Sequence, residues 1–179
     1  MSKQTESEYK QVIALCKDVF EKKTKDYGTA WRILRLPSIT DQLFIKAQRI
    51  RSIQEKGVQK VADDIKNEFI GIINYSVIAI IQESLTEEDP TEIPYSELEP
   101  KYDATVAETL ALLMDKNHDY GEAWRDMRVS SMTDLILMKL YRVKQIEDNE
   151  GKTIISEPIK ANYQDMINYA VFCMIKLGN

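Results

Sequence analysis

The chain has 179 residues, of which 44% are hydrophobic and 30% charged, a composition typical of a soluble protein with one domain or two small ones. The net charge of −5 argues against a surface for duplex nucleic acid, because proteins that bind the phosphate backbone usually carry a basic face. No apolar run has the length of a membrane span, and the first ten residues contain no signal-peptide core. We therefore expect a cytoplasmic protein without a membrane partner.

The cysteine and histidine content argues against two further classes of site. Cys16 and Cys173 are far apart in the sequence and lie in apolar helical patterns, which predicts buried, reduced thiols. His118 is the only histidine of the chain. A histidine-rich metal site and a histidine-based catalytic triad are therefore not expected.

The first helix of the chain is predicted over residues 8–23, where apolar residues recur at helical spacing. It is followed by the segment KDYGTAW at residues 25–31. Gly28 in this segment can adopt a positive φ, so we expect it to stop the helix. A closely similar segment, HDYGEAW, returns at residues 118–124, after a second predicted helix over residues 104–116.

The repetition extends well beyond these segments. At an offset of 93 positions (119 − 26 = 93), many polar identities continue through the next predicted helix. They include Arg32 with Arg125, Asp41 with Asp134, Lys46 with Lys139, and Arg49 with Arg142. Such a series of spaced identities is not expected by chance, so the sequence predicts a tandem duplication.

One additional residue in the second copy changes the offset to 94, at which Ile-Asn-Tyr at residues 73–75 matches residues 167–169. We predict a first helical repeat over residues 5–85 and a second over residues 101–177. Residues 86–100 between them contain prolines and many acidic residues, which is typical of a surface linker.

The second helix of each repeat is expected to open at Ser38 and at Ser131, because Ser-x-x-Asp at both places resembles a capping box. Gly57 and Gly151 are the expected stops of these helices.

The third helix of each repeat is predicted over residues 61–83 and 158–177, and Pro158 suits a first helical turn. No strand signal is present. The predicted fold class is all-α, with about six main helices from a duplicated three-helix unit. One such unit has a small core, so the two are expected to pack as one domain with pseudo-two-fold symmetry.

Polar and aromatic residues that both repeats retain are the candidate binding residues. Lys46 and Arg49 lie three positions apart, so their charged groups project on one side of the helix, the side that holds its anion-favouring start. Aromatic rings beside these cations would suit a base and its phosphates. The predicted substrate-binding residues are Asp26, Tyr27, Gly28, Trp31, Lys46 and Arg49, with Asp119, Tyr120, Gly121, Trp124, Lys139 and Arg142 in the second repeat.

Structural roles could also explain why these residues are retained. Trp31 and Trp124 could anchor the core, and Asp26 could cap the turn that Gly28 makes. Asp41 could cap a helix, and the cations could form a solvated face with weak ion pairs.

The third helices differ between the repeats in their acidic residues. Asp165 occupies the position of Gly71, and Asn162 occupies the position of Glu68. Carboxylate oxygens suit Mg²⁺, which usually takes one or two of them together with phosphate oxygens. Glu68, Glu157 and Asp165 are therefore candidate metal ligands, either in one composite site or in two separate sites that have decayed. Solvated acidic faces are the alternative.

The combination of K-x-x-D-Y-G-x-A-W, S-x-T-D-x4-K-x2-R and a later I-N-Y resembles the nucleotide modification associated domain 1 family. In phages and bacteria, that family is associated by genomic context with nucleotide and base modification. It is distantly similar to the all-α MazG-like nucleoside triphosphate pyrophosphohydrolases. The resemblance implies a helical, MazG-like fold and a role in handling nucleotides.

MazG-like enzymes bind Mg²⁺ through an E-E-x-x-E helix and a later E-x-x-D helix. The corresponding helices here read DQLFIKAQR at residues 41–49 and DLILMKLYR at residues 134–142, with lysine and arginine at the positions where acids would bind the metal. Metal-dependent hydrolysis therefore does not follow from the resemblance alone.

Two hypotheses about function follow. The first is a nucleotide-binding protein associated with nucleotide or base modification, whose enzymatic form would be a Mg²⁺-dependent nucleoside triphosphate pyrophosphohydrolase. Its partner would be a nucleotide or modified nucleotide, and not duplex nucleic acid. The alternative is a non-catalytic helical interaction or regulatory module. Pairing of the chain into a homodimer is left open.

Overall fold

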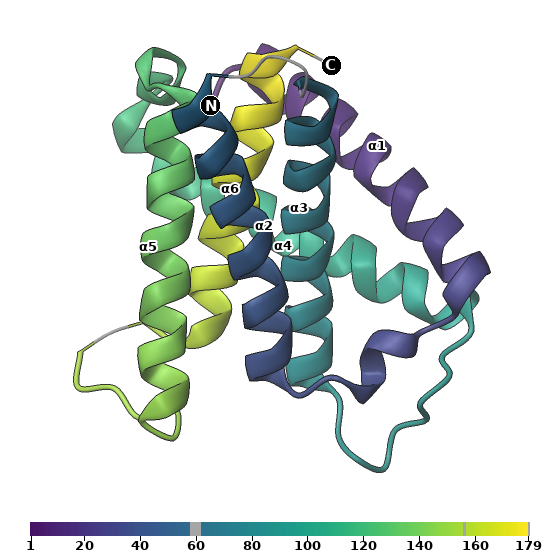
Figure 1. Cartoon of the computed structure of the whole chain (residues 1–179). Coiled ribbons are helices and arrows are strands. Elements are labelled where there is room, and N and C mark those ends of the chain that lie inside the picture. The colour runs from purple at the N-terminus through teal and green to yellow at the C-terminus, as the bar shows by residue number, and fades with distance from the viewer. Residues whose placement is uncertain (58–61, 156, 179) are drawn as a thin grey trace.

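The computed structural model describes residues 1–57, 62–155 and 157–178, and within these ranges it contains helices and no strand (Figure 1). The all-α fold class with six main helices is confirmed. The main helices are α1 (Lys3–Tyr27), α2 (Leu36–Lys56), α3 (Ala62–Ser84), α4 (Tyr95–Tyr120), α5 (Val129–Asp148) and α6 (Ile159–Leu177). Two short 3₁₀ helices, η1 (Ala30–Ile33) and η2 (Ala123–Asp126), follow α1 and α4. No described helix combines the length and apolar character that a membrane span requires.

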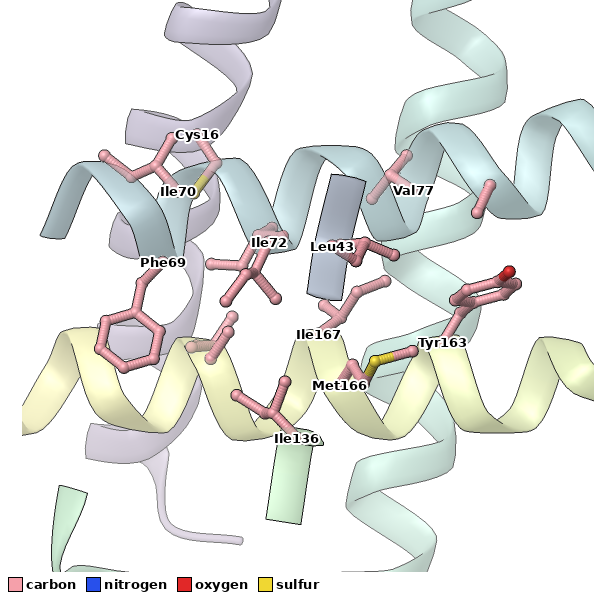
Figure 2. Packing of buried hydrophobic residues seen from close by; sticks show 14 of the residues in the cluster. Cys16, Leu43, Phe69, Ile70, Ile72, Val77, Ile136, Tyr163, Met166 and Ile167 are labelled. Carbon is pink, nitrogen blue, oxygen red and sulfur yellow. The ribbon is translucent and has the colours of Figure 1, made fainter. Parts of the chain in front are cut away.

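The centre of the fold is the packing of α3 against α6, the third helices of the two repeats. They run antiparallel, and Figure 2 shows side chains of both, among them Ile72 and Ile167, filling the space between them. Both of these isoleucines are fully buried. α2 and α5 pack against each other and against these central helices, which completes an antiparallel four-helix core.

The first helices, α1 and α4, lie outside this four-helix core (Figure 1). Each packs on both central helices, and more extensively on that of the other repeat: α1 on α6 and α4 on α3. This exchange is the pattern that a pseudo-two-fold axis produces, as predicted from the duplication. Cys16 and Cys173 are buried and free, as expected, and burial raises the pKa of both thiols to about 12.

The predicted glycine stops are largely confirmed. Gly28 caps α1 with φ 61° and donates its N–H to the carbonyl of Thr24 at 2.8 Å. Gly57 caps α2 in the left-handed conformation. In the second repeat, α5 instead ends two residues earlier than expected, with Asn149 as its cap and Gly151 beyond it at φ 77°.

The predicted capping boxes at Ser38 and Ser131 are wrong. α2 and α5 both begin two residues earlier, and the residues that precede them, Arg35 and Arg128, make no side-chain capping bond. In α2, Pro37 lies in the first turn, where its fixed φ suits a helix and its missing N–H costs nothing. The proline favours this earlier start in α2, whereas α5 begins at the equivalent residue without a proline.

The predicted linker over residues 86–100 is too long, because α4 already begins at Tyr95 and carries Pro100 inside it. The helix predicted over residues 104–116 therefore starts too late in the prediction. Leu98 and Tyr102 on both sides of Pro100 are fully buried, so tertiary packing keeps this segment helical. The predicted start of the third helix at Val61 lies outside the described residues.

Two matched hydrogen bonds join the repeats inside the core. The Tyr9 hydroxyl donates to Oδ1 of Asn168 at 2.7 Å, and the Tyr102 hydroxyl donates to Oδ1 of Asn74 at 2.8 Å. Each bond connects the first helix of one repeat with the third helix of the other. The asparagines of the retained Ile-Asn-Tyr motif therefore fix how the repeats pack, since a buried amide requires its partner.

The retained aspartates Asp41 and Asp134 also act between the repeats. Lys144 lies 3.4 Å from Asp41, and Arg51 lies 3.6 Å from Asp134, at equivalent places of the α2–α5 contact. Neither aspartate caps a helix. These pairs are partly exposed, so each contributes little to stability, but together they favour this register of α2 against α5.

We predict that Tyr102→Phe and Tyr9→Phe each lower the free energy of unfolding by about 1–3 kcal/mol, because each change leaves a buried asparagine oxygen without its donor. Urea unfolding followed by circular dichroism measures this loss. Tyr141→Phe, at a half-exposed tyrosine of α5, is the control and should change stability by less than about 0.5 kcal/mol. Equal stabilities of all three variants would contradict the prediction.

Candidate nucleotide-binding cavities

The first repeat contains a cavity of about 690 Å³ between the end of α1, η1, α2 and α3, which we call the first cavity. Its volume lies within the usual range of small-molecule sites. Aromatic and apolar side chains form most of its lining, and two lysines add positive charge. The residues that define it here are Lys23, Tyr27, Trp31, Lys46 and Tyr75.

The second repeat contains a cavity of about 1090 Å³ at the equivalent place, the second cavity. Its lining includes Lys116, Tyr120, Lys139 and Tyr169, which correspond in the duplication to Lys23, Tyr27, Lys46 and Tyr75. The loop between α5 and α6 contributes further side chains to it. The duplication has therefore produced two related cavities in one chain.

The structure brings four of the six predicted residues of the first repeat into the first cavity: Tyr27, Gly28, Trp31 and Lys46. Arg49 is connected with Lys46 by a shared ion-pair partner, Glu68. The Glu68 carboxylate is 2.6 Å from the guanidinium of Arg49 and 3.7 Å from the ammonium of Lys46. The same ammonium lies 5.5 Å from the ring centroid of Tyr75. Glu68 therefore pairs mainly with Arg49 and holds Lys46 only loosely.

The second cavity contains Tyr120, Lys139 and Arg142 of the predicted binding residues, together with the acids Glu157 and Asp165. Asp165 lies 2.8 Å from the ammonium of Lys139 and 3.0 Å from that of Lys116. Partial burial works to lower the pKa of Lys116, but the hydrogen bond and charge of Asp165 outweigh it and raise this pKa. Asp165 thus forms ion pairs with two lysines at once.

The remaining predicted residues do not line the cavities. Asp26 and Asp119 are exposed, and Gly121 lies outside the second cavity. Trp124 is buried, and its ring stacks on Phe172 with centroids 4.2 Å apart and planes at 6°. The structural explanation therefore holds for Trp124, whereas its partner in the duplication, Trp31, faces a cavity.

The expected role of a helix start is wrong. Lys46 lies ten residues after the first residue of α2, Leu36 (46 − 36 = 10), which is about 15 Å along the helix axis. The favourable field of a helix N-terminus is confined to the first turn. Positive charge in the first cavity therefore comes from the lysine side chains themselves.

The family model described as nucleotide modification associated domain 1 matches residues 23–82 and 116–177. The matched segments together cover more than half of the chain. The protein belongs to this family. The starts of the segments are 93 positions apart (116 − 23 = 93), which is the offset of the duplication, so the family domain occurs twice.

No curated protein matches this chain, and no solved structure matches it. The likeness to MazG-like pyrophosphohydrolases therefore stays an expectation from sequence motifs. The family membership itself connects the chain with nucleotide modification, through the name that the family carries.

The family's D-Y-G segment has a structural role in both repeats, because each copy holds the start of the other repeat's first helix. The Thr29 hydroxyl donates to the carbonyl of Thr91 at 2.6 Å, just before α4. Glu122 accepts from the backbone N–H of Ser2 at 2.9 Å and from the Thr5 hydroxyl at 2.6 Å, at the start of α1. These contacts fix one wall of each cavity.

The arginine that follows the tryptophan completes this attachment. Arg125 forms an ion pair with Glu8 of α1 at 2.6 Å, and its guanidinium lies 4.4 Å from the Trp124 ring. Arg32 instead donates to backbone carbonyls of the linker, which passes beside η1 in Figure 1: those of Thr86, Asp89 and Pro90. The same residue therefore attaches the segment to α1 in one repeat and to the linker in the other.

Of the three predicted magnesium ligands, two pair with cations and one lines a cavity. Glu68 and Asp165 each lie against two cations, and Glu157 lines the second cavity. In the part of the chain that the structure describes, no three histidine, cysteine, aspartate or glutamate side chains form a group that could hold a metal ion. The acids present do not fit a metal site built by the protein alone, and Mg²⁺ stays a prediction.

Sequence reasoning missed Lys23 and Lys116 as cavity residues. Both stand three positions before the aspartate of D-Y-G and are identical at the offset of the duplication. That identity was the available signal. Tyr75 and Tyr169 were recognised as retained residues, and the structure now places one in each cavity.

We predict that Glu122→Gln removes stability that depends on pH. Partial burial works to raise the pKa of Glu122, but hydrogen bonds from Thr5, Ser2 and Arg125 lower it from 4.5 to about 2. A lowered folded-state pKa stabilises the protein above the unfolded value, and this contribution is lost as the pH falls from 4.5 toward 2. Wild type should exceed the variant by roughly 1–2 kcal/mol at neutral pH, and the difference should vanish near pH 2.

Urea unfolding of both proteins across this pH range measures the difference. Glu87→Gln, at an exposed linker residue, is the matched control and should show no such dependence. A difference between wild type and Glu122→Gln that stays constant over the whole range would contradict the argument.

Proposed function

We propose that the first cavity binds a nucleotide, with the base against its aromatic wall and the phosphates at its lysines. The observation that carries this proposal is the presence of four aromatic side chains and two lysines around one cavity of about 690 Å³. Membership of a family named for nucleotide modification supports it.

The aromatic wall supplies a stacking surface for a base. Tyr27 is 69% exposed at the cavity and Trp31 is half-buried, so both rings keep a face for a ligand. Stacking of a base on such a ring contributes about 1–3 kcal/mol and tolerates different bases. A modified base therefore fits this wall as well as an unmodified one.

The lysines supply the phosphate contacts. Glu68 keeps its short contact with Arg49 at 2.6 Å, whereas Lys46 is 3.7 Å away from it. A phosphate can therefore bind Lys46 without breaking the stronger of the two ion pairs. Charge-assisted bonds of this kind are about twice as strong as those between neutral groups.

The proposal concerns binding, and hydrolysis is a separate prediction. The resemblance to pyrophosphohydrolases implies Mg²⁺, but the acids of the described residues do not assemble around a metal ion. A panel of canonical and modified nucleoside triphosphates, assayed with Mg²⁺ for pyrophosphate release, separates an enzyme from a binding protein.

A second candidate function, a non-catalytic helical interaction module, has one observation in its favour. Several retained polar residues act between the repeats, among them Asn74, Asn168, Asp41 and Asp134. Their identity needs no ligand to explain it. The lysines distinguish the two candidates. Lys46 lines a cavity, and its ion-pair partner, Glu68, belongs to the same repeat, so this lysine does not join the repeats through that pair.

We predict that Lys46→Ala weakens nucleotide binding by about 2–3 kcal/mol, roughly 30- to 150-fold, because a charge-assisted phosphate contact is lost. Adding Lys139→Ala tests the second cavity in the same chain. Calorimetric titration with the nucleotide that gives the largest thermal shift measures the change. Lys22→Ala, at an exposed lysine of α1 paired with Asp18, is the control and should bind like wild type.

Two results would refute nucleotide binding. One is a wild-type protein whose thermal unfolding no nucleotide shifts. The other is a Lys46→Ala, Lys139→Ala variant that binds as tightly as wild type, which would favour the interaction module.

A further inference from the structure

We infer that the phosphate of the ligand lies over Gly71, between Lys23 and Lys46, at the place that the Asp165 carboxylate fills in the second cavity. It follows that one chain has one working site, in the first cavity. This inference rests on the proposed function for the identity of the ligand, but its geometry comes from comparing the two cavities.

In the second cavity, Asp165 lies between the two lysines. The oxygens of Asp165 lie 2.8 Å from the ammonium of Lys139 and 3.0 Å from that of Lys116. Only 13% of the Asp165 side chain and 11% of the Lys139 side chain are exposed. A carboxylate is thus held between two lysines on the inner side of the cavity.

In the first cavity, the same two lysines are present and the acid is absent. Lys46 corresponds to Lys139, Lys23 to Lys116, and Gly71 to Asp165 (165 − 71 = 94). A Cβ atom on Gly71 would lie 3.0 Å from Cδ and 3.2 Å from Nζ of Lys46, so the lysine lies directly across the glycine. Lys23 forms no ion pair with any residue of the described ranges.

The carboxylate of Asp165 therefore shows where an oxyanion sits between these lysines. The only acid that pairs with Lys46 in the described part of the first cavity is Glu68, at 3.7 Å, one turn away on α3. No acidic side chain of the described residues lies over Gly71; the Lys46 side chain itself lies across it, and would turn its ammonium toward a bound anion. Lys23 and Lys46 both line this cavity, and two ammonium groups without a carboxylate between them suit the double negative charge of a phosphate.

The aromatic walls point to the same cavity. Trp31 lines the first cavity, whereas Trp124 is stacked on Phe172 in the core and does not line the second. The second cavity thus lacks both the open anion position and the tryptophan beside it. It keeps Arg142 and Lys152 in its lining, so binding of anions elsewhere in it is the competing outcome.

Exchanging the two residues tests this directly, with inorganic pyrophosphate as the probe and calorimetric titration as the measurement. Wild type should bind one pyrophosphate per chain. Gly71→Asp should weaken this site at least tenfold, since an internal carboxylate would then occupy it. Asp165→Gly should open a second site and raise the stoichiometry to two.

Matched variants separate charge from shape and folding. Gly71→Ala adds the Cβ without the acid and should weaken binding much less than Gly71→Asp. Asp165→Ala removes the acid without placing glycine inside α6, where glycine costs about 1 kcal/mol in helix stability, and it should open the second site as well. Circular dichroism confirms that each variant is folded before it is titrated.

The outcomes distinguish the inference from the proposed function. Wild type that binds two pyrophosphates, or Gly71→Asp that binds as wild type does, overturns the inference. If pyrophosphate follows the expected pattern while no nucleotide binds, the anion position stands and the proposed nucleotide function falls. If a nucleotide binds wild type and Gly71→Asp equally, nucleotide binding stands and the position over Gly71 is wrong.

Discussion

The buried contact between α3 and α6 is the interaction on which the rest of the structure depends. Each repeat alone has three helices and a small core, so its third helix would leave one apolar face exposed to water. Joined about a pseudo-two-fold axis, the two faces cover each other, and the bonds from Tyr102 to Asn74 and from Tyr9 to Asn168 fix the pairing. α1 and α4, whose ends line the two cavities, each pack on the central helix of the other repeat as well as on that of their own.

Local features of the fold could be predicted from the sequence, whereas features that depend on distant partners could not. Gly28 and Gly57 end helices because glycine readily adopts a positive φ. The residue type at one position is therefore enough to predict the end of the helix. The start of α4 could not be predicted, since burial of Leu98 and Tyr102 outweighs the proline between them. The duplication showed that Asn74 is retained in both repeats. Its hydrogen-bond partner, Tyr102 on α4, is distant in the sequence and could be identified only from the structure.

In the candidate site, too, the sequence predicted which residues take part but not which neighbours they contact. Lys46, Tyr27 and Trp31 were identified because both repeats retain them, and the structure places them around one cavity. Identical residues nevertheless have different environments: Trp31 faces a cavity while Trp124 is buried on Phe172. Sequence comparison of the repeats reports which side chain is kept, but not which neighbour it meets. The acids Glu68 and Asp165 were interpreted as metal ligands, and their actual neighbours are lysine and arginine.

The acids also show how a duplicated site can diverge without losing its charge balance. In the first repeat the acid is Glu68 and the residue one turn later is Gly71; in the second, the acid is Asp165 and the earlier position holds Asn162. Each half thus keeps one carboxylate near the equivalent lysine, at 2.8 Å from the buried Lys139 and at 3.7 Å from the partly exposed Lys46. Moving that carboxylate by one helical turn changes whether the space between the two lysines is filled or open. A single acid can therefore act as a structural counter-ion in both halves, and under the inference above only the first half would receive the phosphate of a ligand.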